Sequence, residues 1–185
     1  MVIVAGRSTR SLGSMRESVV IRPIEPSDSL QELTDLLHRA YASLGQMGLN
    51  YTAVDQPPET TARRISRGQC FVAADGTRLI GTIVVEPPNP DSPCEYFASE
   101  GVASAHQLAV APENQRSGLG VALLERAEAW ARDRGFRELA IDTAEPAEHL
   151  RSFYGRRGYR HVGFVQWQGK VYRSVVLSKE LKHAA

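Results

Sequence analysis

The chain has 185 residues, a formal net charge of +1 and a hydrophobic content of 42%. A chain of this length forms one hydrophobic core, and its near-neutral charge excludes a global attraction to nucleic acid or to anionic membranes. Its apolar runs are shorter than the roughly 18 residues of a membrane-spanning helix, and its N-terminus lacks the pattern of a signal peptide. We therefore expect a cytoplasmic protein with no nucleic-acid or membrane partner.

The two cysteines, Cys70 and Cys94, lack the Cys-x-x-Cys spacing and the flanking histidines of a zinc site. Cys70 lies in an apolar run and is expected to be buried. We expect no metal ion.

The first half of the chain shows both helical and strand patterns. Residues 1–17 have no usable period and predict a flexible N-terminal arm, so that a single domain spans residues 18–185. The periodicity of apolar residues, an N-cap sequence and a turn at Asp75-Gly76 predict the elements that follow. They are a strand at 19–24, helices at 26–45 and 59–67, and the hairpin strands 70–74 and 78–86.

Two loops in this part of the chain are unusual. The loop 46–58 carries Met47 and Tyr51, which either cap the core or line a pocket. The loop 87–102 starts with a proline-rich run and contains Glu95 and Glu100 beside aromatic residues. A loop of this length in a compact domain is disordered or forms a functional lid, and the aromatic residues favour a lid.

The second half predicts a strand, a helix and a strand that form a right-handed crossover, so that the two strands are parallel. The crossover helix has an apolar stripe, with Glu128 on its polar side. The predicted elements are strands at 103–111 and 138–143, helices at 118–135 and 147–157, and a closing hairpin of 159–165 and 172–177. The fold class is α/β, or α+β, with one mixed sheet of about seven strands and helices on both faces.

The loop 115–120 connects a strand to the start of a helix. Gly118 and Gly120 leave the first helical turn nearly free of side chains, so unpaired amides and the positive end of the helix dipole meet there. Such a helix start suits a phosphate or pyrophosphate. A dinucleotide-binding motif needs a third glycine where Leu123 follows, and a Walker loop needs a Gly-Lys-Ser or Gly-Lys-Thr that the sequence lacks. Both alternatives are disfavoured.

Three motifs resemble the GNAT family of N-acetyltransferases. They are Leu108-Ala109-Val110-Ala111-Pro112, the loop Gln115-Arg116-Ser117-Gly118-Leu119-Gly120 with the family pattern Gln/Arg-x-x-Gly-x-Gly/Ala, and Phe153-Tyr154-Gly155-Arg156-Arg157-Gly158-Tyr159. The resemblance covers residues 19–181 and implies the family's fold, in which the fourth and fifth strands splay apart. It also implies acetyl-CoA as the co-substrate.

The resemblance assigns cofactor contacts to this chain. The amides of residues 115–120 donate to the pyrophosphate, and Arg116 adds charge. The pantetheine arm pairs with the fourth strand at Leu108, Ala109 and Val110. The thioester carbonyl then points near the Val110 amide, which stabilises negative charge there.

A general base helps because an amine is mostly protonated at neutral pH. His106 is the first candidate, because its pKa lies in the useful range and strand alternation places it on the face of Leu108 and Val110. Arylalkylamine acetyltransferases look similar here, with a His-x-His before Leu-Ala-Val; this chain has Ser104 in place of their first histidine. Glu86 and Glu100 are alternative bases.

Tyr154 matches the family's tyrosine on the last helix, and its phenol is the candidate general acid for the leaving thiolate. The acceptor pocket is expected in the two unusual loops. Its candidate residues are Met47, Tyr51, Glu86, Glu95 and Glu100. The acidic residues of these loops suggest a cationic acceptor.

The sequence therefore predicts an N-acetyltransferase that acts on a primary amine, of a small molecule or an amino terminus, by direct attack in a ternary complex. Two alternatives stay open: a non-catalytic acyl-CoA-binding module and a protein lysine acetyltransferase. A homodimer is possible through the closing hairpin, where Trp167 and Tyr172 are candidates for an exposed apolar patch.

Overall fold

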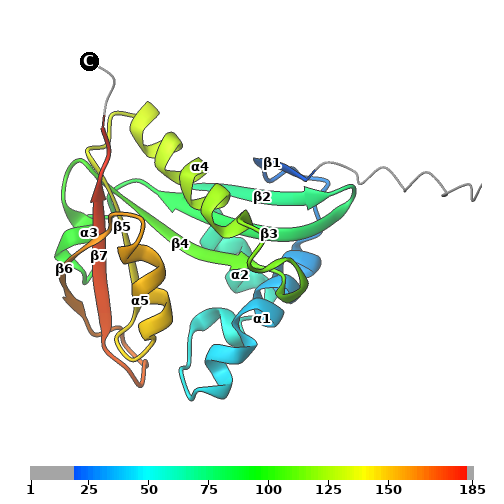
Figure 1. Cartoon of the computed structure of the whole chain (residues 1–185), viewed down its shortest axis with the longest axis horizontal. Helices are drawn as coiled ribbons and strands as arrows, with labels where there is room; N and C mark the ends of the chain where they lie inside the picture. The colour runs from blue at the N-terminus through cyan, green and yellow to red at the C-terminus, as the bar shows by residue number, and fades with distance from the viewer. Residues whose placement is uncertain (1–18, 183–185) are drawn as a thin grey trace, which may run out of the picture.

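Seven strands form one mixed sheet in the order β1-β2-β3-β4-β5-β7-β6 (Figure 1). The computed structural model describes residues 19–182, so the expected arm at 1–17 lies outside the described residues. The strands are β1 (Val20–Pro23), β2 (Gln69–Asp75), β3 (Arg78–Glu86), β4 (Val102–Val110), β5 (Glu138–Ala144), β6 (Arg160–Val165) and β7 (Ser174–Glu180). Neighbouring strands are antiparallel except for β4 and β5, whose parallel pairing confirms the predicted crossover.

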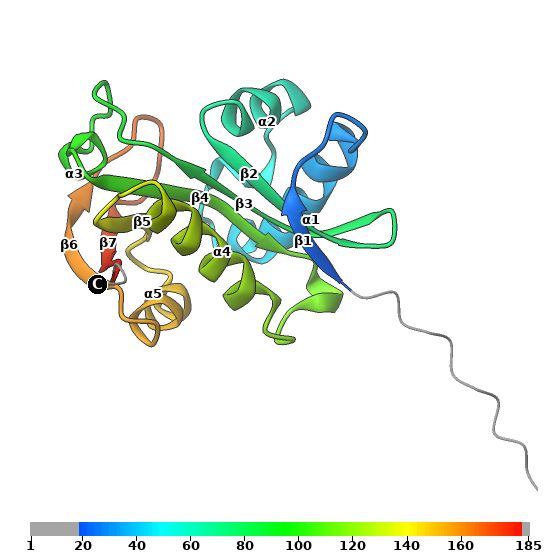
Figure 2. The ribbon, with the colours of Figure 1, turned by 90° about the horizontal axis from the view of Figure 1, so that it is seen from above.

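Helices cover both faces of this sheet. Figure 2 shows α1 and α2 on one face and α4 and α5 on the other. The helices are α1 (Leu30–Gln46), α2 (Pro58–Ile65), α3 (Glu95–Ala98), α4 (Leu119–Asp133) and α5 (Glu148–Gly155), with 3-10 turns at Thr52–Val54 and Pro112–Asn114. Within residues 19–182, each helix is too short or too polar to cross a membrane. The predicted fold class and element order are confirmed; α3 and the 3-10 turns are additions.

Helix α1 forms where the sequence supplies a cap and an apolar stripe. The hydroxyl of Ser29 accepts a hydrogen bond from the Glu32 amide, at 3.2 Å, and so satisfies one free N–H of the first turn. Leu33 and Leu37, one turn apart, are fully buried against the sheet. One further turn along the same face lies Tyr41, which α1 thereby holds beside β4.

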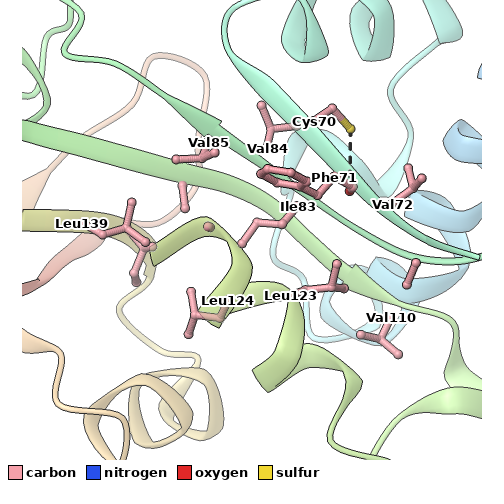
Figure 3. Close-up of a cluster of buried hydrophobic side chains, with 14 of the residues drawn as sticks. Cys70, Phe71, Val72, Ile83, Val84, Val85, Val110, Leu123, Leu124 and Leu139 are labelled. Atoms are coloured by element: carbon pink, nitrogen blue, oxygen red, sulfur yellow. Dashed lines mark hydrogen bonds between the residues drawn. The ribbon is translucent and has the colours of Figure 1, made fainter. Parts of the chain in front are cut away.

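The core on the opposite face lies between α4 and strands β2, β3 and β4 (Figure 3). Phe71, Ile83 and Leu123 are buried there, and each such side chain contributes roughly 1.5–3 kcal/mol through burial. Gly81 lets α4 approach the sheet, because a Cβ at this position would lie only 2.9 Å from Leu123 Cδ1. This close packing fixes the position of the helix start.

The expectation that Glu128 lies on the polar side of α4 is wrong. Its side chain is buried and accepts hydrogen bonds from the Tyr159 hydroxyl, at 3.1 Å, and from Lys179 Nζ, at 2.7 Å. These two hydrogen bonds, one of them from a charged ammonium group, compensate the cost of burying the Glu128 carboxylate.

Strands β4 and β5 part after a short ladder. Only Val102 to Ser104 pair with β5, whereas β4 remains paired with β3 up to Val110. Residues 105–110 of β4 therefore have a β5-facing edge without a strand partner. This parting confirms the splayed sheet that the family resemblance implied.

A β-bulge at Gln107 changes which side chains share a face of β4. Gln107 has a φ of 53°, and the register shifts there so that Val84 faces His106 while Thr82 faces Ala109. Because Thr82 and Val84 share one face of β3, His106 lies on the face of Ala109 and opposite to that of Val110. The expectation that His106 shares a face with Val110 is therefore wrong.

Candidate active site

A cavity of about 930 Å³ lies where β4 and β5 part, and we call it the wedge cavity. Its walls come from β4, β5, α2 and α5, together with the loop 87–93 and residues near 170. Leu108, Ile141 and Tyr154 form part of the apolar wall, and Glu86, His106 and Asp142 part of the polar one. Such a cavity is of the size that encloses a small molecule.

The start of α4 offers several free backbone amides. Gly118 is the N-cap in the left-handed region, with a φ of 89°, and has no side-chain cap. The amides of Arg116, Ser117, Gly118 and Gly120 have no hydrogen-bond partner within residues 19–182. Arg116 is also left-handed, with a φ of 63°, a strained conformation that is typical of ligand-binding loops. The arrangement fits a pyrophosphate.

Gln115 departs from this pattern. Its amide donates to the Pro112 carbonyl at 3.3 Å and is therefore not free for a phosphate, contrary to our expectation. Its side-chain Nε2 instead donates to the Val110 carbonyl at 3.1 Å. Gln115 thus holds the loop against the end of β4.

The free edge of β4 presents amides to the wedge cavity. The Val110 carbonyl points away from β3 to Gln115, and the Leu108 carbonyl accepts from the Tyr41 hydroxyl at 3.2 Å. In a strand, the N–H and C=O of one residue point to the same edge. The amides of Leu108 and Val110 therefore face the parting, where a ligand containing amides can pair like an added strand.

The Tyr154 side chain from α5 lines the wedge cavity. It is buried, and its hydroxyl has no hydrogen-bond partner among the described residues. Burial raises the pKa of this phenol far above its ordinary value, and the nearby Tyr41 raises it further. The hydroxyl is therefore protonated at neutral pH and free to donate.

Glu86, Ser104 and His106 form a polar row in the wedge cavity. Glu86 of β3 pairs with Ser104 of β4, and His106 Nε2 shares a hydrogen bond with Ser104 Oγ at 2.9 Å. The Glu86 carboxylate is buried and forms no salt bridge within the described residues.

The two titratable groups of this row differ in their affinity for a proton. Burial raises the pKa of Glu86 above its ordinary value, an effect that Arg67 and Arg64 partly oppose. Burial lowers the pKa of His106 to about 3, helped by the positive charges of the same arginines. His106 is therefore neutral and weakly basic, and Glu86 binds a proton more readily.

Basic side chains form a wall of the wedge cavity that the sequence analysis missed. Arg63, Arg64 and Arg67 come from α2 and the residues after it, and Lys170 faces them from the loop before β7. The missed signal was the spacing of Thr60, Arg63, Arg64 and Arg67, at helical positions i, i+3, i+4 and i+7, which gathers them on one helix face.

The residues expected in the acceptor pocket separate into two groups. Tyr51 and Glu86 line the wedge cavity, and the Tyr51 hydroxyl also accepts from the Ala144 amide at 2.8 Å. Met47, at 53% exposure, and the exposed Glu95 and Glu100 do not line it. Met47 ends α1, and the two glutamates belong to or follow α3, whose apolar side faces inward.

The expected apolar patch of Trp167 and Tyr172 is not at the surface. Tyr172 is buried beside Tyr51, with ring centroids 5.1 Å apart. Trp167 stacks on Phe97 at 6.1 Å and donates from Nε1 to Asp142 at 2.8 Å. Phe97 in turn packs edge-on against His106 at 5.5 Å. These aromatic residues support the cavity wall.

The splayed sheet, the open helix start and the free phenol define an acyl-CoA-type transferase site, and comparison with known proteins agrees. The family model for the "Acetyltransferase (GNAT) family" matches residues 30–159. The chain is 27% identical over 159 residues to S-(2-succino)cysteine N-acetyltransferase of Bacillus subtilis (strain 168), covering 83% of this chain and 91% of that protein. It is 31% identical over 133 residues to aminoglycoside N(6')-acetyltransferase type 1 of Klebsiella aerogenes, covering 70% of this chain and 81% of that protein.

A solved structure shares the fold. It is a GNAT family acetyltransferase from Elizabethkingia anophelis with acetyl-CoA bound, with a TM-score of 0.63 at 19% identity, covering 88% of this chain and 98% of that one. The chain belongs to the acetyltransferase (GNAT) family. It is an acetyl-CoA-dependent N-acetyltransferase, which confirms the predicted reaction class.

Proposed function

We propose that the chain acetylates a primary amine of a small molecule, with the acceptor and the thioester end of acetyl-CoA bound together in the wedge cavity. The observation that supports this most is the Tyr154 hydroxyl, which has no hydrogen-bond partner among the described residues and lines a cavity beside the free edge of β4. When bound, acetyl-CoA supplies an acetyl group on a thioester whose sulfur leaves as a thiolate.

The chain's own groups fit the co-substrate. The free amides of Arg116, Ser117, Gly118 and Gly120 would hold the pyrophosphate at the start of α4. The amides of Leu108 and Val110 would pair with the pantetheine arm and donate to the thioester carbonyl. Such preorganised donors stabilise the charge that develops on the carbonyl oxygen.

Tyr154 acts as the proton donor to the departing sulfur. Its phenol keeps its proton at neutral pH, because burial disfavours the charged form. Its hydroxyl has no hydrogen-bond partner among residues 19–182, so it is free to turn to a ligand atom in the cavity.

Glu86 replaces His106 as our proposed general base. An ionised carboxylate attracts the ammonium form of the acceptor and takes its proton, and the raised pKa of Glu86 makes it the better proton acceptor of the two. His106 then serves as a neutral hydrogen-bonding group that positions Ser104 in the polar row.

The walls and volume of the wedge cavity suit a small-molecule acceptor. The loop 87–93 and Lys170 wall the cavity, and its volume of about 930 Å³ suits a small ligand. The relatives are named for small acceptors, S-(2-succino)cysteine in one and an aminoglycoside in the other. The cytoplasmic location and the homodimer remain predictions, as does a peptide acceptor.

Release of free thiol from acetyl-CoA, measured with a panel of small amines and lysine-containing peptides, tests the proposal. We expect release with at least one small amine and formation of its N-acetyl product by mass spectrometry. Tight binding of acetyl-CoA without release would favour the non-catalytic binding module. Release with peptides alone would favour the protein lysine acetyltransferase.

A further inference from the structure

The cations in the basic wall of the wedge cavity have no carboxylate in ion-pair contact among the described residues. Arg63, Arg64, Arg67 and Lys170 form no salt bridge within residues 19–182. Arg63 donates to the Thr60 hydroxyl and Lys170 to the Asn50 carbonyl, both of which are neutral acceptors. Four cationic groups therefore face the cavity without an anionic partner in contact.

Arg64 and Lys170 are partly desolvated cations of this wall. Burial lowers the pKa of both groups, and the charge of Arg64 lowers that of Lys170 further. Two like charges that repel across a partly desolvated cavity are stabilised by an anion between them.

The side-chain amide of Gln107 is a neutral donor close to Arg64. Gln56 Oε1 accepts from Arg64 Nη1 at 3.5 Å, and Gln56 Nε2 donates to Gln107 Oε1 at 3.3 Å. Gln107 is only 5% exposed, and its own Nε2 has no hydrogen-bond partner among the described residues. A buried amide donor without an acceptor is costly. Gln107 Nε2 and Arg64, which both lie beside Gln56, would therefore be stabilised by an acceptor atom of a ligand in the cavity.

Among the described residues, the carboxylates that line the cavity are those of Glu86, Asp91 and Asp142, fewer than its four cations. The charges of Arg64 and Lys170 act on Asp142, but Asp142 forms no salt bridge with either and accepts from the indole of Trp167 at 2.8 Å. Glu86 lies at the polar row, where the proposed function places the ammonium group of the acceptor. The cavity thus offers a carboxylate to an amine at one place and cations at another.

We infer that the acceptor is an amino-acid-like amine that carries at least one carboxylate, and that Arg64, Lys170 and Gln107 Nε2 bind this carboxylate. The inference rests on the proposed function and replaces the expectation of a cationic acceptor. The phosphates of acetyl-CoA do not account for the basic wall, because their proposed site is the start of α4, on the opposite face of the sheet from α2 (Figure 2).

Matched pairs of acceptors test the inference on the full chain. S-carboxymethylcysteine has an amine and two carboxylates, whereas its dimethyl ester keeps the amine and lacks the charges. We expect kcat/KM to be about tenfold or more higher for the acid than for the ester, since charge-assisted hydrogen bonds to the carboxylates are lost in the ester. Tryptamine serves as an amine without a carboxylate and should react as poorly as the ester.

Variants locate the carboxylate site. Arg64→Gln should raise KM for the acid about tenfold or more while kcat and the KM for acetyl-CoA stay within about twofold. Arg64→Lys should restore part of the affinity, and Arg63→Gln, at an exposed position, should have a smaller effect. Arg132→Gln, outside the cavity, is the matched control. The inference would be overturned if Arg64→Gln lowered kcat/KM equally for the acid and the ester. It would also be overturned if the wild type preferred the ester or tryptamine to the acid.

Binding separates this inference from the proposed function. S-carboxymethylcysteine should raise the Tm of the wild type in the presence of CoA, and should not do so for Arg64→Gln. Absence of thiol release with every amine, together with this Tm shift, would defeat the catalytic proposal and leave the carboxylate site standing. Absence of both the turnover preference and the Tm shift would overturn the carboxylate site.

Discussion

Ser104 of β4 pairs with Ala140 of β5, and the two strands share no ladder partner beyond this pair. The polar row begins at Ser104, because Glu86 lies opposite it and His106 bonds to its hydroxyl. The place where the sheet opens is therefore also the place where the ionisable side chains gather. This coincidence explains why the fold can hold a linear cofactor and an amine acceptor at one point.

Tyr154→Phe should lower kcat by about a hundredfold, which is the usual scale of a lost general acid. Its KM for acetyl-CoA and its Tm should change little, because the hydroxyl has no hydrogen-bond partner within the described residues. Steady-state kinetics and thermal unfolding provide the measurements. An unchanged kcat would remove Tyr154 from the mechanism.

Glu86→Gln should have opposite effects on activity and stability. Burial raises the pKa of the Glu86 carboxyl in the folded state above its ordinary value of 4.5. The folded protein therefore loses stability as the pH rises above 4.5, because it must then keep a buried charge. The variant should therefore unfold at a higher temperature at neutral pH, and this gain should vanish as the pH falls below the unfolded-state pKa.

The pH dependence of kcat/KM in Glu86→Gln tests whether Glu86 is the general base. In the wild type, kcat/KM should rise with pH through the raised pKa of Glu86, and the variant should be slower and lack this acidic limb. Glu100→Gln, at an exposed position outside the cavity, is the control. If both variants keep the wild-type pH profile, another group is the base.

His106→Gln should make the protein more resistant to acid. The pKa of His106 is about 3 in the folded state and ordinarily 6.5, so the unfolded chain takes up the proton first as the pH falls. The wild type therefore loses stability from this group between pH 6.5 and about 3, and none above 6.5. Urea unfolding at stepped pH measures the difference, with the exposed His149→Gln as control. Parallel curves for wild type and His106→Gln would contradict the burial of a neutral imidazole.

Gly118→Ala should weaken acetyl-CoA binding beyond its effect on folding. Gly118 and Gly135 have similar left-handed φ values, 89° and 81°, and neither has an atom within 4 Å of an added Cβ. Each alanine should therefore destabilise the fold by about 1 kcal/mol through backbone strain. Only Gly118→Ala alters the proposed phosphate site, so calorimetric affinity for acetyl-CoA should fall in it and stay unchanged in Gly135→Ala. Equal affinities would argue against the helix start as the phosphate site.

Most of the fold was predictable because its signals are local. The apolar spacing of α1, the Asp75-Gly76 turn and the glycines before α4 each determine structure within a few residues. Gln107 shows the limit: nothing in its neighbours announces a bulge, and that bulge reverses the faces of the residues after it. Glu128 shows another, because its burial depends on Tyr159 and Lys179, which are distant in sequence.

The basic wall was missed for a related reason. The helical spacing of Arg63, Arg64 and Arg67 is visible in the sequence, but an arginine stripe on a short helix is usually a solvated face. Only the tertiary fold turns this stripe toward the parting of β4 and β5 and brings Lys170 opposite it. The character of the acceptor pocket was therefore beyond local sequence patterns.

A crystal structure of the chain with CoA and a carboxylated amine tests the central claim most directly. We expect the pyrophosphate on the amides of residues 116–118 and 120, the pantetheine arm along Leu108–Val110, and the sulfur within hydrogen-bond distance of the Tyr154 hydroxyl. A cofactor bound outside the parting of β4 and β5, or a sulfur remote from Tyr154, would contradict the account.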